Sequence, residues 1–178
     1  MLKLRPALPQ DVPQILAFIR ELALYEREPD AVLATEDDLF RDGFGPNKVF
    51  ACLIADWTEP AVEPGSEATT IPAGFALYFY NYSTWLGHAG IHLEDLYVTP
   101  ALRGKGIGRA LITRVAAIAI EEGCPRLQWD VLEWNTPAIG FYQKMGALMQ
   151  SDWRTMRVTG EALTALGGAT TPNLTIPQ

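Results

Sequence analysis

Cysteine, histidine and long apolar runs are scarce in this sequence, and each scarcity excludes a class of protein. The two cysteines, Cys52 and Cys124, form no C-x-x-C pair and do not stand beside either of the two histidines at metal-ligand spacing. We therefore expect buried thiols and no metal site. No stretch approaches the roughly 18 apolar residues that a bilayer span needs, and the first residues lack the apolar segment of a signal peptide. These features predict a cytoplasmic protein without a membrane partner.

Basic residues are also few. The 14 lysines and arginines are outnumbered by 21 acidic residues, which gives a formal net charge of −7. This sign is wrong for a protein that must neutralise phosphates, so we expect no nucleic-acid partner. The negative field would attract a cationic substrate, although a charge of this size also serves solubility alone.

The length of 178 residues and an apolar content of 48 % fit one domain with a buried core. Residues 57–72 hold three prolines and several small polar residues, which is typical of a loop rather than of a domain boundary. We assign residues 1–166 to the domain and residues 167–178 to a C-terminal tail.

Apolar periodicity and turn residues predict an α/β protein with a mixed, mostly antiparallel sheet flanked by helices. Two helices begin at capping-box-like pairs, Asp11 with Gln14 and Thr35 with Asp38. The predicted strands are 3–7, 49–55, 73–82, 91–98, 127–132 and 147–158, and the predicted helices are 11–25, 35–41, 107–122 and 135–146.

The segment Arg103-Gly104-Lys105-Gly106-Ile107-Gly108 places three glycines between a strand that ends at Val98 and a long helix. Glycines let the backbone come close to a ligand, and the unpaired N–H groups of the first helical turn favour a phosphate. The segment therefore predicts an anion-binding loop, with a purely structural tight turn as the alternative.

Two other phosphate loops do not match this segment. A Walker A loop requires Ser or Thr directly after its Gly-Lys pair, but Gly106 follows Lys105. The dinucleotide fingerprint requires its third glycine at the position of Arg109. The remaining spacing, Arg-x-x-Gly-x-Gly, resembles the pyrophosphate loop of GNAT-superfamily N-acetyltransferases.

Five further blocks, in the same order, resemble the diamine/polyamine and thialysine acetyltransferase branch of that superfamily. They are Leu22–Glu26, Asp42–Gly45, Leu93–Val98, Glu133–Pro137 and Phe141–Tyr142. The resemblance extends from Leu4 to about Leu163. It implies the GNAT fold and an acetyl-CoA-dependent transfer of acetyl to a small primary amine such as a diamine, a polyamine or a thialysine-like amino acid. It also implies a homodimer whose C-terminal segments pack across the interface.

The resemblance also implies two catalytic residues. Glu94 matches the base that deprotonates the amine through water, and a partly desolvated strand end would raise the pKa of its carboxyl group. Tyr142 matches the general acid that protonates the leaving thiolate. In a regular strand Asp95 points to the opposite face from Glu94. The structural alternatives are a surface carboxylate for Glu94 and ordinary packing beside Phe141 for Tyr142.

By the same resemblance, the backbone of one strand and two loops hold the cofactor, and Leu96 N–H lies near the oxyanion. The cofactor-binding positions are Leu96, Tyr97, Val98, Arg103, Gly104, Lys105, Gly106, Ile107, Gly108, Arg109, Asn135, Thr136, Pro137 and Ala138. The amine-binding positions are Tyr25, Glu26, Glu94, Gln128, Trp129 and Asp130. Asn135 alone is also explained as a helix cap.

One departure concerns the acceptor. The polyamine enzymes have an acidic residue and a proline before the tryptophan of a turn, where this chain has Tyr82-Ser83-Thr84-Trp85. This places polyamine specificity in question. Two other functions remain open from the sequence: acetylation of a protein lysine or N-terminus, and non-catalytic binding of an acyl-CoA. Because no cysteine lies near the blocks, direct transfer in a ternary complex is the simpler mechanism.

Overall fold

The computed structural model describes residues 1–59 and 68–168 and divides into two compact units, Met1–Trp134 and the residues from Asn135 onwards. Residues 60–67 of the predicted loop 57–72 and residues 169–178 of the predicted tail lie outside the described residues. The loop prediction is wrong at both ends, because residues 57–59 pair with residues 69–71 as antiparallel strands. The described part of the tail belongs to a helix, so the predicted domain end at residue 166 falls inside that helix.

The first unit is a five-stranded sheet in the order β1-β2-β3-β4-β5. All neighbouring strands are antiparallel except β4 and β5, which are parallel. The mixed, mostly antiparallel sheet that the sequence predicts is confirmed. The strands are β1 (Leu2–Pro6), β2 (Ala51–Glu59), β3 (Thr69–Ser83), β4 (His88–Val98) and β5 (Leu127–Gln128).

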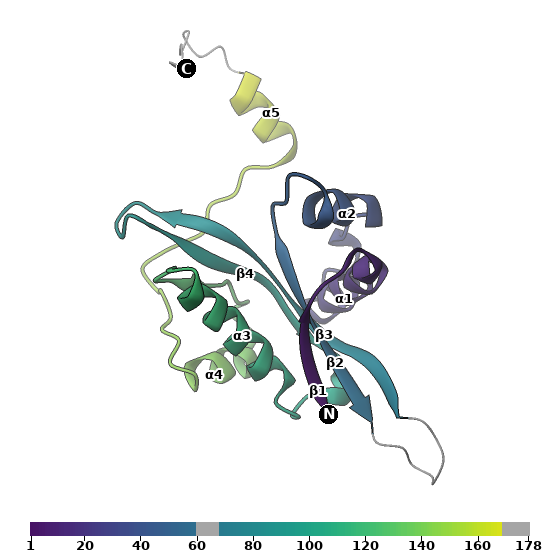
Figure 1. Cartoon of the computed structure of the whole chain (residues 1–178). Helices are drawn as coiled ribbons and strands as arrows, with labels where there is room; N and C mark the ends of the chain where they lie inside the picture. The colour runs from purple at the N-terminus through teal and green to yellow at the C-terminus, as the bar shows by residue number, and fades with distance from the viewer. Residues whose placement is uncertain (60–67, 169–178) are drawn as a thin grey trace. The chain divides into compact units, whose positions relative to one another are not determined.

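Helices cover both faces of this sheet, with α1 (Val12–Tyr25) and α2 (Glu36–Phe44) on one side and α3 (Ile107–Glu121) on the other (Figure 1). On the α1 side, Phe18 stacks on Phe75 with ring centroids 5.6 Å apart. On the other side α3 buries an apolar stripe whose members recur at helical spacing in the sequence: Ile107, Leu111, Val115 and Ile118. Short 3-10 turns cover Pro9–Asp11, Pro29–Ala31 and Pro100–Leu102.

The two predicted helix starts have different outcomes. Thr35 and Asp38 form the predicted capping box of α2, with the Asp38 N–H donating to the Thr35 hydroxyl. Asp11 does not cap α1 with its side chain. Its carboxylate instead accepts from the Leu8 N–H and pairs with Arg5 at 2.6 Å, because this cation is within reach on β1.

Two predicted strands are wrong in whole or in part. The strand predicted at 127–132 is reduced to Leu127–Gln128. Residues 147–158 contain no strand, and α5 (Gly160–Gly168) follows them in the second unit. A strand needs a neighbour for its backbone N–H and C=O groups, and no described strand pairs with this segment. Its apolar side chains are consequently exposed, with Met156 at 90 %.

A β-bulge interrupts β4 in the middle of the predicted site. Tyr78 of β3 is opposite Leu93, whereas the preceding residue Leu77 is opposite Asp95, which leaves Glu94 as the extra residue. Residues directly opposite each other share a face of the sheet. Leu77 belongs to the core on the α1 side. The bulge therefore turns Asp95 toward the face that α1 covers.

Candidate active site

The glycine loop leaves the N-terminus of α3 open. Gly104 and Gly106 adopt left-handed conformations, with φ of 78° and 81°. A β-carbon at either position would meet no atom within 4 Å. Thr35 and Asn135 close the N-termini of α2 and of α4 (Thr136–Gln143) with their side chains, but no side chain caps α3. Its first-turn N–H groups, from Ile107 to Arg109, are thus available to an anion.

Two cations of this loop rest on aromatic rings. The Arg103 guanidinium lies 5.0 Å from the centre of the Tyr25 ring and 5.7 Å from that of Tyr97, and the Lys105 ammonium lies 4.9 Å from that of Trp57. Within the described residues neither cation has a carboxylate at ion-pair distance. A cation–π contact is weak compared with a charge-assisted bond to phosphate. The loop therefore presents open N–H groups and two cations to an anion.

The strand that leads into the loop has a free edge. β5 pairs with β4 only at Ile91 and His92, so from Leu93 to Val98 no described strand covers that side of β4. The main chain of Leu96–Val98 can therefore pair with an extended ligand as another strand would. The Tyr97 side chain belongs to the core, where its hydroxyl donates to Glu21 at 2.7 Å and burial raises its pKa to about 12.

The predicted base, Glu94, lies on the bulge, and 54 % of its side chain is exposed. Its carboxylate is 3.6 Å from the Nε2 atom of His92, whose ring stacks on Phe79 with centroids 4.9 Å apart. Gln128, predicted for the amine, contacts the other ring nitrogen of His92 at 3.4 Å. The Glu94 carboxylate is therefore within reach of water.

The neighbouring carboxylate, Asp95, is the one that burial desolvates. The expectation of a regular strand, with Asp95 opposite to Glu94, is overturned by the bulge. Burial, followed by the nearby charges of Glu94 and Glu26, raises the pKa of Asp95 to about 7. Burial also raises the pKa of Glu26. Three carboxylates therefore interact at one place. The sequence contained no signal for a bulge, so its analysis missed the role of Asp95.

An aromatic cluster closes the end of α1. Tyr25, predicted for the amine, lies against Trp134, with ring centroids 5.9 Å apart. The Arg27 guanidinium lies 4.4 Å from the centre of the Trp134 ring. Neither Arg27 nor Trp134 is among the site residues predicted from the sequence. On the segment that follows β5, Trp129 is half-buried and Asp130 is exposed.

The second unit holds the remaining predicted residues. Asn135 caps α4 as predicted, accepting from the Ala138 N–H at 3.3 Å, and Pro137 lies in the first turn. Thr136 begins the helix. Tyr142 is half-buried near its end, with its ring centroid 5.2 Å from that of Phe141.

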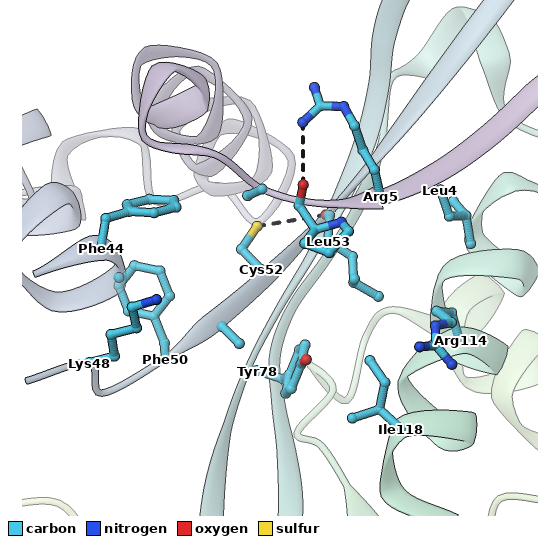
Figure 2. A pocket seen from close by; sticks show the side chains of 14 residues that line it. Leu4, Arg5, Phe44, Lys48, Phe50, Cys52, Leu53, Tyr78, Arg114 and Ile118 are labelled. Atoms are coloured by element: carbon cyan, nitrogen blue, oxygen red, sulfur yellow. Dashed lines mark hydrogen bonds between the residues drawn. The ribbon is translucent and has the colours of Figure 1, made fainter. Parts of the chain in front are cut away.

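A cavity of about 270 Å³ lies beside β1, the edge strand farthest from β5 in the sheet (Figure 2). Phe44, Lys48 and Phe50 line one side, and Arg114 and Ile118 of α3 line the opposite side. None of the residues predicted for acetyl-CoA or for the amine lines this cavity. Across residues 1–59 and 68–168, no three His, Cys, Asp or Glu side chains group around a metal position, and no helix has the length and apolarity to cross a membrane.

Comparison with known families identifies the class of protein. Residues 19–147 match the acetyltransferase (GNAT) family. The chain is also 42 % identical over 168 residues to thialysine N-epsilon-acetyltransferase of Sus scrofa, covering 93 % of this chain and 96 % of that protein. This chain therefore belongs to the GNAT acetyltransferase family, and the predicted N-acetyltransferase activity is confirmed as its class.

Two further relatives carry other acetyltransferase names. The chain is 32 % identical to L-ornithine N5-acetyltransferase NATA1 of Arabidopsis thaliana, covering 92 % of this chain and 87 % of that protein. It is 38 % identical to spermidine/spermine N(1)-acetyltransferase-like protein 1 of Homo sapiens, covering 90 % of this chain and 23 % of that protein.

Solved structures agree on the fold. An integron cassette protein from V. cholerae is similar with a TM-score of 0.72 and 26 % identity, covering 94 % of this chain and 98 % of that one. An aminoglycoside acetyltransferase from a soil metagenome, solved with sisomicin, has a TM-score of 0.67 at 17 % identity over 89 % of this chain and 95 % of that one, which shows the fold alone.

The raised pKa of Asp95 predicts a pH dependence of stability. The folded state binds this proton up to about pH 7, whereas an unfolded aspartate releases it near pH 3.9. The folded state therefore binds more protons between these values, and the contribution of Asp95 to stability declines as the pH rises through that window. We expect the Asp95→Asn variant to lose less unfolding free energy than the wild type between pH 4.5 and 8, measured by urea denaturation.

The exposed Asp30 provides the matched control for this measurement. Asp30→Asn removes the same charge from the surface and should leave the pH slope of the wild type unchanged. Equal slopes for the wild type and for Asp95→Asn would contradict the burial of a proton-binding Asp95.

Proposed function

We propose that this chain transfers acetyl from acetyl-CoA to a small primary amine: a diamine, a polyamine or a thialysine-like amino acid. The observation that carries this proposal is the arrangement along β4, where a carboxylate cluster, a free strand edge and the anion-binding loop follow one another. The thialysine and ornithine acetyltransferase relatives, which match nearly the whole chain, support a small amine as the acceptor.

The first part of the proposed site binds acetyl-CoA, which supplies the activated acetyl thioester when bound. The N–H groups from Gly104 to Arg109 receive the diphosphate, with Arg103 and Lys105 as counter-charges. The backbone of Leu96–Val98 pairs with the pantetheine arm, and the residues from Asn135 to Ala138 form a second contact. The contacts of these cations support this assignment, because Arg103 and Lys105 rest on aromatic rings and not on carboxylates. The Arg103 Nε–H donates to the Val98 carbonyl at 3.0 Å, which leaves its two terminal nitrogens for a phosphate.

The second part prepares the amine. A lysine-like ammonium has a pKa of about 10.4 and must lose a proton before it attacks. Glu94 accepts this proton through water, which the exposure of its carboxylate permits. Glu26 and Asp95 attract the ammonium, and Tyr25 offers it an aromatic face. Gln128, Trp129 and Asp130 complete the proposed amine-binding positions.

The last step returns a proton to the leaving group. The N–H of Leu96 stabilises the oxyanion as the amine attacks, and the Tyr142 hydroxyl protonates the leaving sulfur. The transfer is direct, within a ternary complex, because Cys52 and Cys124 are buried and unsuited to carry an acetyl group. Burial also raises the pKa of Cys52, which keeps its sulfur protonated.

Substitution of the base tests this mechanism. With acetyl-CoA and a small amine, we expect Glu94→Gln to lower kcat about 10²- to 10⁴-fold near neutral pH, because the proton then lacks its acceptor. The loss should shrink as the pH approaches the pKa of the free amine. Release of the CoA thiol, followed from pH 6 to 10 with a thiol reagent, measures both effects.

Glu36→Gln, in the exposed first turn of α2, is the control, and we expect it to keep the wild-type rate. A wild-type rate for Glu94→Gln over the whole pH range would reject Glu94 as the base. Binding of acetyl-CoA without turnover on any amine would instead support a non-catalytic binding protein.

We also propose that the protein works in the cytoplasm as a homodimer, with neither nucleic acid nor a membrane as a partner. The segment 147–168 supports the dimer, because its large apolar side chains are exposed within the second unit. A second copy would cover them. The negative net charge is consistent with the absence of a nucleic-acid partner.

Light scattering tests the dimer. The full chain should have the mass of two copies, and a chain that ends before residue 147 should have the mass of one, because the truncation removes the exposed apolar segment. A wild-type monomer at micromolar concentration would contradict the proposed assembly.

A further inference from the structure

The helix α1 ends in a backbone conformation that disfavours the residue present. The Glu28 N–H donates to the Ala23 carbonyl at 2.9 Å and the Arg27 N–H to the Leu24 carbonyl at 3.2 Å. These two bonds define a Schellman motif with Arg27 at its left-handed position, where φ is 69°. Glycine adopts this conformation at least cost. Among the described residues Arg27 is the only one other than glycine with a positive φ.

The Arg27 guanidinium is held in place but keeps its charge available. It lies over the Trp134 ring at 4.4 Å from the centroid. Within the described residues no carboxylate lies at ion-pair distance from it. Because Trp134 also packs against Tyr25, the aromatic pair fixes this cation beside the proposed amine site.

Opposite charges therefore lie next to each other at the end of α1. Glu26 directly precedes Arg27 and interacts electrostatically with Asp95, so the carboxylates form one pole of the site and the guanidinium forms the other. A basic amino acid has the complementary pair, an ammonium at the end of its side chain and a carboxylate at its α-carbon. A diamine would instead bring a second ammonium toward Arg27.

We propose that Arg27 binds the α-carboxylate of the acceptor and makes the enzyme select a basic amino acid over the diamine of the same chain length. This assignment rests on the proposed function and narrows its acceptor. A guanidinium suits a carboxylate because its planar N–H groups can donate two parallel hydrogen bonds. The stack on Trp134 already restricts the rotamers of Arg27, so that less side-chain entropy is lost when a carboxylate binds.

Acceptor pairs that differ only in the carboxylate test this proposal: L-ornithine with 1,4-diaminobutane, and L-lysine with 1,5-diaminopentane. The measured quantity is the kcat/KM of the amino acid divided by that of its diamine. We expect Arg27→Gln to lower this ratio about tenfold or more. The amino acid loses affinity through a higher KM, and the diamine gains because the repulsion of its second ammonium is removed.

Three variants separate recognition from other effects. Arg20→Gln removes the same charge from an exposed position of the same helix and should leave the ratio unchanged. Arg27→Lys keeps the charge without the planar fork and should give an intermediate ratio. Arg27→Gly relieves the backbone strain, so we expect it to lower the ratio as strongly as Arg27→Gln without lowering the thermal midpoint.

The outcomes distinguish this proposal from the function on which it rests. A wild-type protein that acetylates both members of a pair, with ratios unchanged in Arg27→Gln and Arg27→Gly, would overturn the carboxylate assignment and leave the proposed function standing. If the wild-type protein released no CoA with any of the acceptors, this result would contradict the proposed function itself and the role of Arg27 with it.

Discussion

The open main chain at the start of α3 is the constraint on which the rest of the proposed site depends. Gly104 and Gly106 take left-handed conformations, and no side chain caps the helix that follows. A β-branched side chain could not adopt this turn without strain, and a polar cap would occupy the N–H groups. The neighbouring cations rest on aromatic rings rather than on carboxylates, which preserves the positive potential of the loop.

The bulge in β4 places carboxylates on the strand that leads into this loop. One extra residue brings Asp95 to the α1 face, so that the carboxylates of Glu26, Glu94 and Asp95 interact at the point where β4 loses its neighbour β5. Their environments differ: Glu94 is exposed to water and Asp95 is desolvated. Such a difference suits a division of labour in which one carboxylate moves protons and the other attracts a cation.

The features that sequence predicts correctly here are local ones. The capping box of Thr35, the cap of Asn135 and the apolar stripe of α3 each depend on residues a few positions apart. The wrong predictions depend on distant partners. Asp95 changes face because of the register with β3, Asp11 is drawn to Arg5, and the segment 147–158 lacks a described strand to pair with. The contact of Arg27 with Trp134 joins residues that are far apart in sequence, so no spacing pattern indicated it.

The most direct measurement compares CoA with pantetheine, which lacks the diphosphate, by calorimetry on the wild type and on Gly106→Val. The wild type should bind CoA at least about tenfold more tightly than pantetheine, and Gly106→Val should lose most of this difference while keeping its affinity for pantetheine. Equal affinities of the wild type for both ligands, or an undiminished preference for CoA in the variant, would contradict a diphosphate held by this loop.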